Sequence, residues 1–263
     1  MISLLRRWRI RRLLNLPVPE ERRQWLAEHV TPFEHLHSDR RRRLEQIATV
    51  MIAQRHWEGC EGLVVTEQMK TVIAGNAAVM LLGAADHYYF DTVSAILIFP
   101  GTIRRHHEGH QSPTVGEAWA NGGVVLSWPE VRSIGRTGCG RNVVIHEFAH
   151  HLDGLDGEMG GSIPFNNLDD QQQWETIAFD EYEKLVEDVR HHRQTVLDPY
   201  GATNEAEFFA VCSECFFERP IRMIRAHAEL YGLLKRFYQI DPLEWADPKL
   251  RPTGGSGHAR TGG

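Results

Sequence analysis

His146-Glu147-Phe148-Ala149-His150 fits the pattern HExxH and is the most informative stretch of the chain for its fold and its chemistry. Residues four apart lie on one face of an α-helix, so His146 and His150 can offer two imidazoles to one metal ion. Glu147 lies one position round the helix, where its carboxylate can act on a metal-bound water without being a ligand. This spacing predicts a zinc-binding helix of the metallopeptidase type.

The surroundings of the motif favour a buried helix. Apolar residues flank the polar ones, and Gly154 follows where the helix is expected to end. The alternative is that His146 and His150 are core histidines with hydrogen-bond partners and that Glu147 pairs with an arginine. Asp153 shares the face of the two histidines. It either orients a ligand imidazole or ends the helix facing solvent.

A catalytic zinc takes three protein ligands and leaves one position for water. Since no histidine follows between His151 and His191, a glutamate on a second helix is favoured as the third ligand. Glu207 is the best candidate because it stands in an apolar run within a helix expected at 204–218. Residues 204–207 also fit a capping box, in which Glu207 reaches back to the N-cap instead.

Two residues near this expected helix are further candidates. Glu214 lies seven positions after Glu207 on the same face, and is either the alternative ligand or a group that supports one. Tyr200 lies seven positions before Glu207, in the turn that precedes the helix. A phenol there either donates a hydrogen bond to the oxyanion of a tetrahedral intermediate or is ordinary packing.

The chain as a whole predicts an α+β fold, mainly helical and zincin-like, with a small β-sheet beside the HExxH helix. Residues 1–19 are expected to be a basic arm and residues 251–263 a flexible, Gly-rich tail. Residues 20–250 form the metallopeptidase domain, with a helical part at 20–85 and a catalytic part at 86–250.

Two runs predict strands, at 92–99 and 122–128, and the second is placed where an edge strand can hold a peptide substrate by main-chain pairing. Several segments predict helices by their periodicity and caps. They are 20–30, 38–57, 66–85, 170–193, 204–218 and one or two short helices within 221–242.

The charge of the chain is unevenly distributed. Residues 1–43 hold eleven Lys/Arg against five Asp/Glu, and the remaining residues hold 18 against 30. The acidic catalytic part argues against nucleic acid as a direct partner. For residues 1–16, a basic arm that docks on the acidic body is favoured over a membrane-surface helix.

Four cysteines in a chain of 263 residues do not indicate a disulfide framework, and Cys212-x-x-Cys215 is best interpreted as a coincidence within a helix. The longest apolar run is too short to span a bilayer. Arginines near the start interrupt any signal-peptide core. We therefore expect a cytoplasmic protein.

Three segments carry a resemblance to known proteins: His146-Glu-Phe-Ala-His-His-Leu-Asp-Gly-Leu-Asp-Gly157, Asp198-Pro-Tyr-Gly-Ala202, and Glu207-Phe-Phe-Ala-Val211 with Ser213-Glu214. In these segments the chain resembles the Mlc titration factor A family of bacterial zinc metallopeptidases, over residues 20–245. The combination of HEFAH with Tyr-x6-Glu is also similar to the catalytic domain of anthrax lethal factor, a gluzincin pattern.

This resemblance implies that His146, His150 and Glu207 bind one zinc ion per chain, that Glu147 is the general base and that Tyr200 stabilises the transition state. It also implies peptidase or aminopeptidase activity and binding to the glucose-responsive repressor Mlc.

Two functional hypotheses follow from the sequence. The first is zinc-dependent hydrolysis of peptide bonds in a peptide or protein substrate. The second is that the chain chiefly sequesters a transcription regulator, with incidental hydrolysis. A purely structural zinc site fits poorly, because the chain has one HExxH and no completed set of cysteines.

Overall fold

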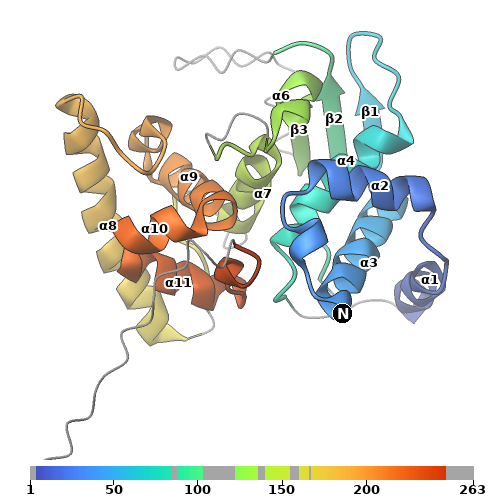
Figure 1. The fold of residues 1–263 in the computed structure, drawn as a ribbon, viewed down its shortest axis with the longest axis horizontal. Helices are drawn as coiled ribbons and strands as arrows, with labels where there is room; N and C mark the ends of the chain where they lie inside the picture. The colour runs from blue at the N-terminus through green and yellow to red at the C-terminus, as the bar shows by residue number, and fades with distance from the viewer. Residues whose placement is uncertain are drawn as a thin grey trace, which may run out of the picture.

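A three-stranded parallel sheet lies beside the HExxH helix (Figure 1). The computed structural model describes residues 4–84, 88–102, 122–135, 140–154, 160–165 and 167–246. The strands are β1 (His56–Gly59), β2 (Ala95–Phe99) and β3 (Gly123–Ser127), in the order β1-β2-β3. In this register Ile96 lies between Trp57 and Val124.

Helices from the first part of the chain pack together on one side of the molecule (Figure 1). They are α1 (Leu4–Leu14), α2 (Glu20–His29), α3 (Ser38–Gln54) and α4 (Glu67–Val79). Helix α4 is buried along most of its length and packs against α2, α3 and the HExxH helix. Because its sequence is apolar nearly all round, α4 forms the centre of this half of the core.

Helices α6 (Trp128–Ser133) and α7 (Val143–Asp153) follow the sheet, and both pack against β3 and α4. The second half of the molecule consists of α8 (Leu168–Arg190), α9 (Glu205–Glu218), α10 (Pro220–Ala226) and α11 (Ala228–Tyr238). Helix α7 carries the HExxH motif and packs against β3 and α4 on one side and against α9 on the other. The motif therefore lies where the two halves meet.

The predicted fold class, α+β and mainly helical with a small sheet, is confirmed. Two predicted helix ends are wrong. The helix expected at 38–57 ends at Gln54, because the polar segment His56–Gly59 pairs with β2 as an unpredicted strand. The helix expected at 66–85 ends at Val79. A Cβ at Gly83 would lie 2.4 Å from the carbonyl oxygen of Tyr238, so the chain turns closely past the end of α11 there.

The two predicted strands are shorter than expected. The first begins at Ala95 rather than 92. The second ends at Ser127, because the Ser127 side chain accepts a hydrogen bond from the Glu130 N–H (3.4 Å) and caps α6, which begins at Trp128.

The basic start of the chain forms a helix that packs against the body of the protein. Helix α1 lies against α3, Ile10 is buried, and Arg6 donates a hydrogen bond of 2.9 Å to Asp91. Among the described residues, no helix is long and apolar enough to cross a membrane. The division into arm, domain and tail stays a prediction, and the tail at 251–263 lies outside the described residues.

Candidate metal centre

Helix α7 presents its polar residues from a buried position. His146 and His150 are each 3% exposed and Glu147 is 5% exposed. The helix begins after Asn142, whose side chain accepts a hydrogen bond from the Ile145 N–H (3.2 Å). It ends before Gly154, as the sequence predicts. Burial on this scale requires polar partners for all three side chains.

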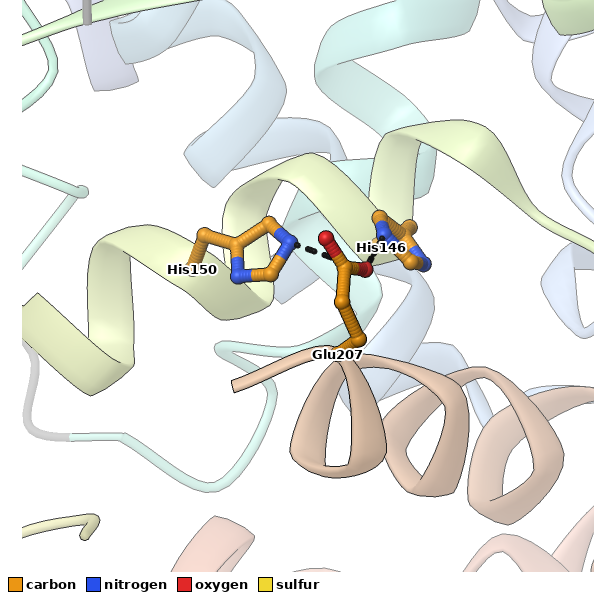
Figure 2. A group of neighbouring side chains, drawn as sticks. All are labelled: His146, His150 and Glu207. Carbon is orange, nitrogen blue, oxygen red and sulfur yellow. Dashed lines mark hydrogen bonds and ion pairs between the residues drawn. The ribbon is translucent and has the colours of Figure 1, made fainter. Parts of the chain in front are cut away.

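Helix α9 brings Glu207 to the two histidines. Glu207 Oε2 lies 2.9 Å from His146 Nε2 and 3.5 Å from His150 Nε2. Figure 2 shows the Glu207 carboxylate pointing between the two imidazole rings. One potential ligand atom from each of these residues lies within 4.8 Å of the others. Two imidazole nitrogens and one carboxylate oxygen form a donor set that fits zinc and leaves a fourth position open.

The capping box considered for Glu207 is formed only in part. Asn204 does cap α9, since its side chain accepts a hydrogen bond from the Glu207 N–H (2.9 Å). The Glu207 carboxylate lies against the histidines. The geometry therefore favours the ligand interpretation that the sequence left open.

The contacts of His146 and Glu207 change the pKa values of both side chains. Burial disfavours the charged form of His146, but hydrogen bonds with Glu207 and Glu214 outweigh it and raise the pKa of the imidazole to about 9. Burial also opposes the charge on Glu207, yet its hydrogen bonds with His146 and His150 hold the pKa of this carboxyl well below its usual value. A metal ion binding here would replace the proton on His146.

Glu214 contacts His146 from the side opposite Glu207 and does not join the cluster of His146, His150 and Glu207. Its Oε1 lies 2.7 Å from His146 Nδ1, the ring nitrogen that does not face Glu207. Its Oε2 accepts a hydrogen bond of 2.5 Å from the Asn142 N–H. A carboxylate on the far nitrogen fixes the tautomer and orientation of a metal-binding imidazole.

Asn142 joins helix α7 to two other helices. Its side-chain amide donates to Asn76 Oδ1 on α4 (3.0 Å) and to Glu218 Oε1 at the end of α9 (2.8 Å). The other Glu218 oxygen accepts a hydrogen bond from Thr31 (3.2 Å). Asn immediately before an apolar helix is an N-cap signal, but nothing in the sequence indicates its contacts with Asn76 and Glu218.

Tyr200 is also brought to the site. It lies in the short 3-10 helix Pro199–Ala202, which the Asp198 side chain caps by accepting a hydrogen bond from the Tyr200 N–H (2.9 Å). This turn packs against α9, and the centroid of the Tyr200 ring lies 5.9 Å from that of His146. The Tyr200 ring therefore lies next to the candidate metal-binding cluster.

Comparison with known proteins identifies the family of the chain. A sequence model of the glucose-regulated metallo-peptidase M90 family matches residues 5–239. The chain belongs to this family. An uncharacterized protein of Synechocystis is 32% identical over 247 residues, which cover 90% of each chain. The Mlc titration factor A of Serratia proteamaculans is 32% identical over 241 residues, covering 86% of this chain and 90% of the relative. The Mlc titration factor A of Yersinia pestis is 30% identical over 244 residues, which cover 87% of this chain and 88% of the relative.

Other predicted features of this M90 chain lie outside the cluster. Asp153 is buried rather than facing solvent, and its Oδ2 accepts a hydrogen bond from the Gly161 N–H (3.0 Å). Cys212 and Cys215 are buried free thiols whose pKa values burial raises, that of Cys215 to about 12. Among the described residues, the histidine–glutamate cluster is the one group of three or more metal-binding side chains. The pair Cys212-x-x-Cys215 therefore belongs to the core.

Proposed function

We propose that this M90 chain is a zinc-dependent peptidase that hydrolyses peptide bonds in an aminopeptidase-like manner. The observation that carries the proposal is the convergence of His146, His150 and Glu207, with Glu147 buried on the same helix. When bound, zinc would lower the pKa of its water toward ~7 and polarise the scissile carbonyl.

Other residues of the chain would transfer the proton, stabilise the oxyanion and align the substrate. Glu147 takes the proton of the attacking water and passes it to the leaving amine. Tyr200 donates a hydrogen bond to the developing oxyanion, which its position beside His146 supports. Strand β3 is the last strand in the order β1-β2-β3 and packs against α7, so a substrate paired along it would lie beside the metal ligands.

The test is to compare zinc-loaded wild type with Glu147→Gln on a panel of peptides and aminoacyl-arylamides, with bound zinc measured in both. The expected result is turnover by the wild type and none by a variant that still holds zinc. Ser133→Ala, an exposed change on α6, is the control variant and should keep the zinc content and the turnover of wild type. Equal rates in wild type and Glu147→Gln would contradict the catalytic role of Glu147.

A second candidate function is sequestration of the repressor Mlc, which the name of the Serratia and Yersinia relatives, Mlc titration factor A, favours. Binding of purified Mlc by Glu147→Gln as tightly as by wild type would show a partnership independent of hydrolysis. Failure of both proteins to bind Mlc would remove this candidate. The cytoplasmic location expected from the sequence stays a prediction.

A further inference from the structure

Helix α1 has one face fixed to the body of the protein. Ile10 is buried in the core, Leu14 packs against it, and Arg6 pairs with Asp91. The helix lies on the outside of α3, at one end of the molecule (Figure 1). Its orientation is therefore set by these contacts, and the opposite face points away from the protein.

That outward face consists of one aromatic side chain among four arginines. Trp8 is 60% exposed, and Arg7, Arg9, Arg11 and Arg12 are all exposed. At 100° per residue, Trp8 lies near the middle of the arc that these arginines cover. The Arg12 guanidinium lies 5.9 Å from the centroid of the Trp8 ring. Among the described residues, none forms an ion pair with these four arginines.

The opposite end of the molecule carries the opposite charge. Helix α8 lies at the far end from α1 in Figure 1 and holds eight Asp/Glu against two Lys/Arg. Residues 1–19 contain five arginines and no Asp or Glu. A molecule with this charge separation approaches a negatively charged surface with α1 leading and α8 directed away.

We propose that the outward face of α1 binds the surface of a bilayer that contains anionic phospholipids. Guanidinium groups match lipid phosphates with paired hydrogen bonds. An exposed tryptophan among cationic side chains is suited to the interface between headgroups and acyl chains. Leu16, 57% exposed just beyond the helix, adds a second apolar contact. The face belongs to a single helix on the outside of the body, which suits a flat partner.

The arginines of α1 determine how tightly the helix is expected to bind an anionic bilayer and how that binding depends on salt. Each Arg near an anionic bilayer strengthens binding about fivefold, so replacing three of them weakens it about 100-fold. The attraction falls as the Debye length shortens from about 10 Å at 0.1 M salt to about 3 Å at 1 M. The apolar contribution of Trp8 is less sensitive to salt.

The experiment is co-sedimentation of the full chain with phosphatidylcholine vesicles that contain or lack phosphatidylglycerol. Wild type should bind only the anionic vesicles, and binding should weaken as salt increases. The triple change of Arg7, Arg9 and Arg12 to Gln should weaken binding about 100-fold, and Trp8→Ala should weaken it at all salt concentrations. These side chains point outward, so circular dichroism should show unchanged folding.

Matched control variants remove three arginine charges or one exposed aromatic side chain at positions outside α1. Gln at the exposed positions Arg42, Arg132 and Arg190 removes the same charge, and Phe179→Ala removes an aromatic side chain that is 55% exposed on α8. Both controls should bind anionic vesicles like wild type. The proposal is overturned if wild type does not bind, if the charge control loses as much affinity as the α1 triple variant, or if single-stranded DNA binds α1 more tightly than the vesicles do.

Discussion

Glu214 holds His146 from the side opposite Glu207, with Glu214 Oε1 2.7 Å from His146 Nδ1. The two carboxylates thus occupy both ring nitrogens, and only the one on Nε2 faces His150. This relationship supports the proposal that Glu207 binds the metal and that Glu214 orients His146, although both residues lie on the same face of α9.

Replacing Glu214 with Gln should weaken zinc binding by about 10- to 100-fold, because the amide no longer accepts hydrogen bonds from both His146 and the Asn142 N–H. Competition with a chromophoric zinc chelator measures the affinity. Glu205→Gln, an exposed change at the start of α9, is the control and should leave it unchanged. Unaltered affinity in Glu214→Gln would contradict the orienting role.

Asn142→Ala should lower the free energy of unfolding by about 2–4 kcal/mol. The change removes the cap of α7 and leaves the buried Asn76 oxygen and an oxygen of the partly buried Glu218 without their donor. Asn167→Ala removes the cap of α8 at an exposed position and should cost only about 1 kcal/mol. Urea unfolding of both variants gives the comparison. Equal costs would show that the bonds from Asn142 to α4 and α9 contribute little.

Gly161→Ala should destabilise the protein by about 1–3 kcal/mol. Gly161 has a φ of +75°, and a Cβ there would lie 2.5 Å from the carbonyl oxygen of Glu205, two residues before Glu207. Zinc affinity should fall as well, because the start of α9 must shift. Gly160→Ala meets no atom within 4 Å and should have little effect on either property. Thermal unfolding and chelator competition test both effects.

Tyr200→Phe should reduce kcat by about 10²- to 10³-fold, if the phenol stabilises the oxyanion as proposed, and should leave zinc affinity unchanged. Steady-state kinetics on the substrate cleaved by wild type provide the measurement. Tyr182→Phe, on α8, is the matched control. A Tyr200→Phe variant with normal kcat would assign Tyr200 to packing.

Acid should weaken the contact between α8 and the segment that joins α10 to α11. His227 Nδ1 lies 2.8 Å from Glu181 Oε2, and this hydrogen bond lowers the pKa of Glu181 below its ordinary 4.5. The folded pKa is depressed, so the stabilisation is complete above pH 4.5 and is lost as pH falls through the folded pKa.

Glu181→Gln should therefore be less stable than wild type at neutral pH, and the difference should shrink as the solution is acidified below pH 4.5. Urea unfolding at a series of pH values checks this. Glu183→Gln is an exposed change on the same helix. Its free energy of unfolding should differ from that of wild type by the same amount at every pH. A difference that grows with acid would contradict the assignment to Glu181.

Local patterns predicted much of the fold. The helices at Glu20–His29, Leu168–Arg190 and Glu205–Glu218 were each expected within a few residues, because caps and apolar periodicity act over one or two turns. The strand β1 was missed, since His56–Gly59 is short and polar and exists through its pairing with β2. Strands of this kind depend on partners that are distant in the sequence.

The amino-acid sequence is sufficient to place His146, Glu147 and His150 on one buried helix, because a spacing of four residues and flanking apolar residues are local properties. The packing of the folded chain is needed to show which of the two glutamates on α9 faces both histidines and which one contacts the far ring nitrogen. Glu207 and Glu214 lie 61 and 68 residues from His146, and the same helical face carries both. Their roles follow from how α7 and α9 pack together, and a sequence pattern does not specify that packing.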